Sequence, residues 1–322
     1  MTKKNIMMII GVTVFATLLW RLDMRLAWQT IKQADLFQMM VTVSLVAFSQ
    51  WLTFQKWVLM DKATNAGHKA SIKTIFSSIT VAGMVTPARS GDLIASMAWK
   101  EIKGKVLAWS VFHRVSEGLV TIVISFSVLG LFFKSFYRGA DWIFAFIVFG
   151  TLLSCIFIAL HQAIGRAFFR FIKQILKKAE TYKVVKKLLS FEEEIKHHFD
   201  LFHETLATFK RKKVLSYLVS MTLINRFTIV AFNVMLFRAL GVHFPLINVL
   251  GVLAAAWVGS FLAPTPNGIG IGDVAPSLMM IHYGLHNEAG AYILISRLFD
   301  IAILLFWGYQ FYSSSNALQQ KV

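Results

Sequence analysis

The chain has 322 residues, 57% of them hydrophobic, and a mean hydropathy of +0.62. This composition excludes an ordinary soluble domain and predicts an all-α protein that crosses a membrane several times. The net charge of +17 would suit nucleic acid, but membrane proteins collect Lys and Arg in loops that face anionic lipid. We therefore expect no nucleic acid among its partners. Because Cys155 is the one cysteine, a disulfide framework and a cysteine-based metal site are excluded.

Six apolar segments are expected to cross the bilayer, which takes a helix of about 20 residues. They are residues 6–20, 36–57, 106–133, 142–160, 215–236 and 292–311. The first resembles a signal peptide, because Lys3 and Lys4 precede it. It lacks a small-x-small cleavage site, so we interpret it as an uncleaved span.

Two further apolar stretches are interrupted by proline and glycine where hydropathy places them in the bilayer. Residues 74–86 and 93–99 flank the segment Pro87–Asp92. Residues 245–262 and 274–283 flank the segment Pro264–Asp273. Non-helical backbone at that depth survives only where protein buries it or water reaches it. Each stretch is therefore expected to form a re-entrant helical hairpin.

The landmarks of the first hairpin recur after the second. Arg114 and Glu117 follow the first tip, and Arg297 and Asp300 follow the second, each pair being three residues apart. This indicates an internal repeat, with a first region at 36–133 and a second at 215–312. Residues 161–213 between them are basic and amphipathic, which predicts a linker lying on the membrane surface.

The distribution of charge predicts the orientation. The linker, with its histidines solvated, and both termini are assigned to the cytoplasm, as is a basic cluster comprising Lys56, Lys62, Lys69 and Lys73. The first hairpin then enters from the cytoplasmic face and the second from the opposite face. Inverted repeats with broken helices are a known transporter design. The expected location is the cytoplasmic (inner) membrane.

Charged side chains at bilayer depth normally face a cavity or a partner. The candidate substrate-binding residues lie at the hairpin tips and on the spans that follow: Arg89, Asp92, Arg114, Glu117, Asn267, Gly268, Gly270, Asp273, Arg297 and Asp300. Guanidinium groups and helix N-termini suit a phosphate, and a lipid headgroup is the natural anion at that depth. The structural alternative is that the acids form ion pairs within the fold or cap helices. Arg226 is interpreted as interfacial.

The sequence offers no catalytic motif. Gly268–Gly272 resembles a dinucleotide loop but follows no soluble strand, and the nine histidines show no metal-binding spacing. His113, beside Arg114, is interpreted as structural. We expect no cofactor and no metal.

Four motifs in order resemble the transmembrane, flippase-like domain of lysylphosphatidylglycerol synthases. They are Pro87-Ala-Arg-Ser-Gly-Asp92, the Arg114–Glu117 pair, Pro264 to Asp273, and Arg297-Leu-Phe-Asp300. The resemblance runs from about residue 40 to the C-terminus, and it implies movement of a lipid headgroup between leaflets. The family usually has Glu where this chain has Asp92 and Asp273. Bifunctional relatives add an aminoacyl-transfer domain, and because this chain ends at Val322 we expect a stand-alone member without it.

Three hypotheses follow. The first is a flippase that moves an anionic phospholipid or a polyprenyl-phosphate-linked headgroup, with membrane lipids as its ligands and a lipid-biosynthetic enzyme as a partner. The second is a membrane enzyme acting on a polyprenyl phosphate, which would need Asp92 and Asp273 in a metal-binding cluster. The third is a scaffold that recruits partners through the basic linker.

Overall fold

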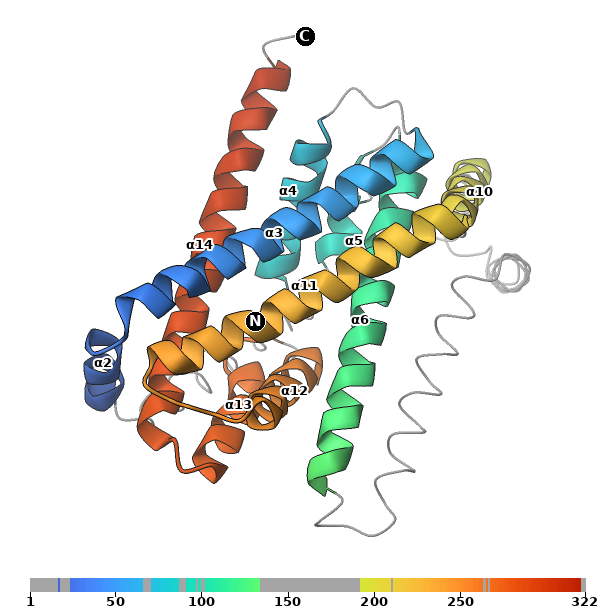
Figure 1. Cartoon of the computed structure of the whole chain (residues 1–322). Coiled ribbons are helices and arrows are strands. Elements are labelled where there is room, and N and C mark those ends of the chain that lie inside the picture. The colour runs from blue at the N-terminus through green and yellow to red at the C-terminus, as the bar shows by residue number, and fades with distance from the viewer. Residues whose placement is uncertain are drawn as a thin grey trace, which may run out of the picture.

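The computed structural model describes Thr17 and residues 24–65, 71–86, 91–96, 98–99, 102–133, 192–209, 211–262, 265 and 267–319. Within these ranges the chain forms helices joined by turns, without strands, as its composition predicts. The helices are α2 (Met24–Lys32), α3 (Leu36–Thr64), α4 (Ile72–Val85), α5 (Gly91–Ser96), α6 (Lys103–Phe133), α10 (Glu192–Phe209), α11 (Lys212–Ala239), α12 (Leu246–Leu262), α13 (Ile271–His282) and α14 (His286–Gln319) (Figure 1).

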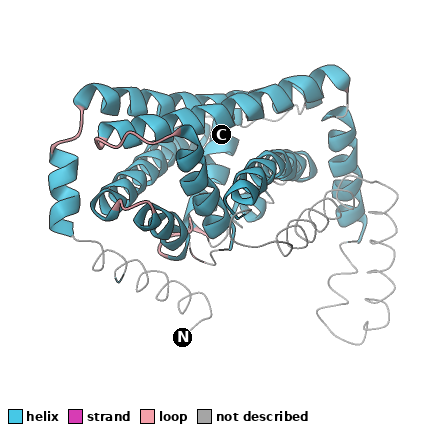
Figure 2. Cartoon of the chain, turned by 60° about the horizontal axis from the view of Figure 1, so that its bottom comes forward, coloured by secondary structure: helices cyan, strands magenta, loops and turns pink. Residues whose placement is uncertain are grey.

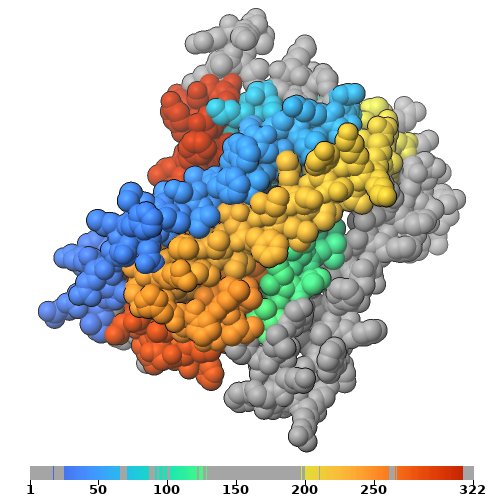
Figure 3. Space-filling model, viewed as in Figure 1, coloured from blue at the N-terminus to red at the C-terminus, as the bar shows by residue number. Residues whose placement is uncertain are grey.

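Four described helices, namely α3, α6, α11 and α14, are long and apolar enough to cross a membrane. They coincide with four of the six predicted spans, while the spans predicted at 6–20, apart from Thr17, and at 142–160 lie outside the described residues. Large apolar side chains cover the outside of these helices: Phe227 of α11, for example, is 71% exposed. Figure 3 shows α3 and α11 side by side on one face. Such a surface is stable against hydrocarbon rather than water.

The two long helices α3 and α11 pack against each other in opposite directions. The amide of Asp35, just before α3, donates to the carbonyl of Ala239 at the end of α11 at 2.9 Å. Midway along the pair, Ser49 Oγ donates to Asn225 Oδ1 at 2.7 Å. The N-terminus of α3 is defined by Asp35, whose carboxylate accepts from the amide of Gln38.

The two broken stretches form helical hairpins, as their proline and glycine content predicts. In the first hairpin α4 packs on α5, and in the second α12 packs on α13. Close approach explains the glycines: a Cβ on Gly91 would overlap the carbonyl oxygen of Ala82, and one on Gly259 would lie 3.1 Å from the carbonyl oxygen of Gly272. Residues 87–90, 263, 264 and 266 of the tips lie outside the described residues.

The hairpins exchange partners between the two halves of the chain. The first leg of the first hairpin, α4, packs on α14, and the first leg of the second, α12, packs on α6. The helices at the two ends of the α3–α11 pair also pack on a helix of the other half of the chain: α2 packs on α14, and α10 packs on α6. Figures 1 and 2 show α2 and α10 at opposite ends of that pair. The two sets of helices, α2–α6 and α10–α14, therefore contact each other reciprocally. The first helix and the first hairpin leg of each set pack on the last helix of the other set.

Two hydrophobic cores hold this arrangement together. One surrounds Trp57 and Trp109, whose rings meet edge to face at 6.1 Å between α3 and α6. The other surrounds Phe237 and Tyr292, whose rings stack at 5.1 Å between α11 and α14. Each core is built mostly from one set of helices and is completed by the other set, through α10, α11 and α14 in the first core and through α2 in the second.

Two surface assignments made from sequence are wrong. Lys56 was grouped with a basic cytoplasmic cluster, yet its side chain is 1% exposed among α3, α6 and α11. His203 was expected to be solvated, yet it is 5% exposed on α10. Helix α10 lies on α6, where the rings of Phe209 and Phe112 are 4.9 Å apart. A helical apolar stripe shows that a face is covered but not whether lipid or protein covers it.

The close packing of the first hairpin gives a testable prediction. Gly91→Ala would press a methyl group into the backbone of α4 and should lower the stability of the purified protein by about 1–3 kcal/mol. Gly118→Ala is the matched control, because no atom lies within 4 Å of its added Cβ. Thermal unfolding in detergent measures both variants. Equal melting temperatures would contradict the described α4–α5 contact.

Candidate functional site

An aspartate near the tip of the second hairpin is bound to an arginine of the following span. Arg297 donates to Asp273 through Nη2, at 2.7 Å from Oδ1, and through Nε, at 3.2 Å from both oxygens. Its Nη1 donates to Asp300 Oδ2 at 2.8 Å and to the carbonyl oxygen of Asn267 at 3.1 Å. One buried guanidinium thus joins α14 to the hairpin tip and to the first turn of α13.

In the described part of the second hairpin tip, backbone groups bind to one another and to Asp273. Gly270 donates its amide to Asp273 Oδ2 at 3.0 Å, and Gly272 donates to the carbonyl oxygen of Gly268 at 2.7 Å. The turn needs left-handed backbone, with φ of 46° at Asn267 and 71° at Gly268. The capping role considered for Asp273 is supported by this bond, because its carboxylate accepts from the amide of Gly270, the N-cap residue of α13.

The first hairpin carries the equivalent pair in a more open setting. Asp92, in the first turn of α5, is bound by Nη2 of Arg114 on α6. A Cβ on Gly83 would overlap the Asp92 carboxylate, so the glycine makes room for it against α4. The side chain of Arg114 is 35% exposed, whereas that of Arg297 is 14% exposed. The first pair is consequently the more accessible to a ligand.

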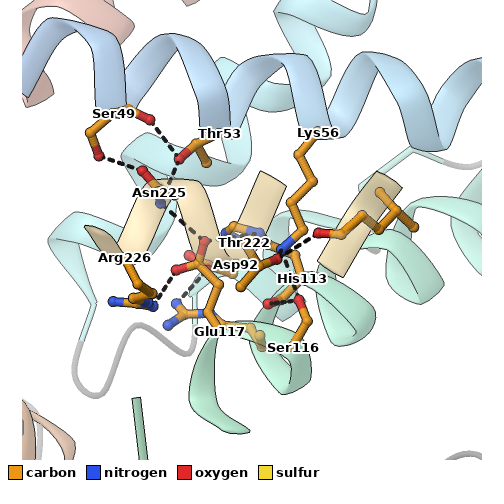
Figure 4. Close-up of polar contacts among 12 residues, drawn as sticks. Ser49, Thr53, Lys56, Asp92, His113, Ser116, Glu117, Thr222, Asn225 and Arg226 are labelled. Carbon is orange, nitrogen blue, oxygen red and sulfur yellow. Dashed lines mark hydrogen bonds and ion pairs between the residues drawn. The ribbon is translucent and has the colours of Figure 1, made fainter. Parts of the chain in front are cut away.

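A polar network continues from the first hairpin into the α3–α11 pair (Figure 4). Glu117 accepts from Arg226 Nη2 at 2.5 Å and from Asn225 Nδ2 at 3.4 Å. Asn225 in turn accepts from Ser49 on α3. The guanidinium of Arg226 also lies 5.7 Å from the ring centroid of Trp257, on the first leg of the second hairpin. Arg226 therefore contacts both halves of the chain.

The same network holds the buried Lys56. Its Nζ donates to Ser116 Oγ on α6 and to Thr222 Oγ1 on α11, both at 2.8 Å. His113, one turn before Glu117, has its Nδ1 3.7 Å from Glu117 Oε1. We name the set comprising Asp92, Arg114, Glu117, Arg226 and Lys56 the first-hairpin cluster.

The predicted site residues separate into two groups. The first-hairpin cluster contains Asp92, Arg114 and Glu117, and the second hairpin with α14 contains Asn267, Gly268, Gly270, Asp273, Arg297 and Asp300. Arg89 lies outside the described residues. Sequence reasoning missed Lys56 and treated Arg226 as interfacial. Position within a long apolar segment was the available signal for both, because a cation there needs a partner.

The described residues contain no group of three or more His, Cys, Asp or Glu side chains that could hold a metal ion. Asp92 and Asp273, which the enzyme hypothesis needs together, are each held by an arginine of a different span. The geometry does not favour that hypothesis.

A family comparison accounts for most of the chain. Residues 8–308 match the family model described as Lysylphosphatidylglycerol synthase TM region. This chain belongs to that family. Membership confirms the resemblance based on the four motifs, and with the four candidate spans it establishes a multi-pass membrane protein with a lipid-related function. Comparisons with curated proteins and with solved structures gave no match.

Within this member of the family, the second-hairpin ion pair should be a major source of stability. Arg297→Gln would leave the buried Asp273 carboxylate without its guanidinium and should cost about 3–5 kcal/mol. The double variant Asp273→Asn/Arg297→Gln should be destabilised by less than the sum of the single variants. Arg238→Gln, at an exposed position of α11, is the control and should change stability by less than about 0.5 kcal/mol. Additive losses in detergent unfolding would contradict the prediction.

Proposed function

We propose that this protein moves a lipid with a phosphate-containing headgroup between the two leaflets of the cytoplasmic membrane. The observation that carries the proposal is the first-hairpin cluster, which gathers Arg114 and Arg226 beside a broken helix within candidate spans. Guanidinium groups bind phosphate oxygens through paired hydrogen bonds. Membership of a lipid-related membrane family supports a lipid as the source of that phosphate.

The two hairpins have different roles in this proposal. Arg114 is the more exposed arginine and exchanges its bond to Asp92 for the phosphate, while Glu117 holds Arg226 ready beside it. The second hairpin, which includes Asn267, Gly268 and Gly270, is held on α14 by the Asp273–Arg297–Asp300 contacts and serves as the fixed wall. The asymmetry of the two pairs supports this division.

Reciprocal packing supports an inverted repeat. Helices α3 and α11 occupy matching places in the two sets, contact each other and run in opposite directions. Helices related in this way have opposite orientations in a membrane. We therefore infer that the first hairpin opens towards the cytoplasm, together with both termini, and the second towards the other face. Transporters use this arrangement to expose one midplane site alternately to each side.

The second repeat unit in this proposal begins at α10 rather than at residue 215. Helix α10 packs on α6 as α2 packs on α14, so α10 occupies the place in its set that α2 occupies in the other. This assignment gives the end of the predicted linker a structural role.

The proposal predicts the behaviour of Arg114→Gln in proteoliposomes. Loss of the accessible guanidinium should slow the movement of a fluorescent phosphatidylglycerol at least about tenfold, since a charge-assisted bond is worth roughly 1.5–3 kcal/mol. Arg238→Gln is the control for the loss of one positive charge. Dithionite quenching of the outer leaflet measures the rate.

A second arm uses a fluorescent polyprenyl phosphate and separates the two lipid classes. Movement of one probe and not the other identifies the substrate class. Wild-type rates for Arg114→Gln with both probes, or no movement of either by the wild type, would contradict the proposed function.

A further inference from the structure

Lys56 is a buried amine with two hydroxyl groups as hydrogen-bond partners, and both hydroxyls can act only as acceptors towards it. Ser116 Oγ donates its hydrogen to the carbonyl oxygen of His113 at 2.9 Å, and Thr222 Oγ1 donates to that of Leu218 at 2.8 Å. Each hydroxyl can therefore only accept from Lys56 Nζ, which lies 2.8 Å from both (Figure 4).

The number of acceptors matches a neutral amine. An uncharged amine has two N–H groups and a lone pair, whereas an ammonium has three N–H groups. Among the described residues two acceptors meet Lys56 Nζ, and no carboxylate forms an ion pair with it. An ammonium that is 1% exposed in a candidate span, without a bound carboxylate, costs several kcal/mol. The neutral form satisfies every N–H group without that cost.

Within the first-hairpin cluster, as the structure describes it, the charges balance when Lys56 is neutral. Arg114 and Arg226 are matched by Asp92 and Glu117 in two ion pairs. The charged and titratable groups on the elements packed around Lys56 include His113, Arg114 and Glu117 on α6, Arg226 on α11, Asp92 on α5, the exposed Lys73 on α4 and the buried His203 on α10. Of these, Glu117 and Arg226 act on Lys56 most directly.

We propose that Lys56 is a proton-binding site coupled to the anionic headgroup. The inference rests on the proposed function, because it needs a phosphate to bind beside Arg226. The phosphate adds a negative charge and draws the guanidinium away from Glu117. Lys56 then binds a proton from the aqueous phase through its nitrogen lone pair, and no covalent bond in the protein breaks. Headgroup and proton enter together, so the first-hairpin cluster with its bound monoanionic headgroup has the same net charge as the cluster alone.

Linkage fixes the sign of the pH dependence. An anion that favours the ammonium form raises the affinity of Lys56 for a proton, and the proton raises the affinity for the anion by the same factor. Binding should therefore take up a proton where the free site is neutral and weaken as the pH rises further.

Titration calorimetry with dihexanoyl phosphatidylglycerol tests the proposal on the full chain in detergent. Repeating the titration in buffers with different ionisation enthalpies gives the number of protons taken up, expected to approach about one per bound lipid within the range of about pH 6 to 9. Lys56→Met should abolish the uptake and flatten the pH dependence of binding. Lys62→Met, the same substitution at an exposed position of α3, should retain both.

The outcomes separate the two proposals. Binding by the wild type without proton uptake, or uptake that persists in Lys56→Met, overturns the role of Lys56 and leaves the proposed function standing. Absence of binding for both this lipid and a short polyprenyl phosphate overturns the proposed function and the coupling with it. If Lys56→Met does not fold, the number of protons that the wild type takes up on binding the lipid still tests the coupling. Thr222→Val, which removes one acceptor from the ammonium, should then shift the uptake to lower pH.

Discussion

The high cost of placing charge in a low-dielectric interior governs the architecture of this protein. Each hairpin presents an aspartate to an arginine on the next span, so that Asp92 meets Arg114 and Asp273 meets Arg297. An arginine in a membrane helix without a carboxylate would be strongly unfavourable, and so would the carboxylate alone. The ion pairs therefore fix where each hairpin lies against its span. Described backbone groups beside the helix breaks find partners within the protein, as the amides of Gly91 and Gly270 do with Thr86 and Asp273.

The two ion pairs are equivalent in position but not in environment. The second is more enclosed, with the Asp273 carboxylate bound to the amide of Gly270 in its own hairpin tip as well as to Arg297. The first leaves Arg114 more accessible and continues into a network that reaches Arg226 and Lys56. Two hairpins with similar sequence landmarks can therefore differ in rigidity, with the second held firmly and the first more adaptable. In the proposed function, alternating access needs one part that holds its place while another moves, and the asymmetry of the two ion pairs supplies that difference.

The reciprocal packing links the two halves mechanically. Because α4 lies on α14 and α12 lies on α6, neither hairpin can shift without a response from a span of the other half. Arg226 adds a polar link, since it binds Glu117 in one half and faces Trp257 in the other. Coupling of this kind is carried by contiguous packed elements with more than one arrangement. In the proposed function, a headgroup bound at Arg226 is therefore placed where a local change reaches both hairpins.

The sequence alone determined the all-helical membrane class, four of the spans, the two breaks and the motifs that define the family, because hydropathy, proline and glycine act locally. It also indicated candidate site residues, because a charged residue within an apolar segment can be recognised from the sequence alone. These residues include Asp92, Arg114, Asp273 and Arg297. Only the tertiary structure decided which charges pair. It brought Glu117 to Arg226 across 109 positions of the chain and buried Lys56 between two hydroxyls. Those contacts depend on how α3, α6 and α11 pack, and an apolar helix face does not encode its partner.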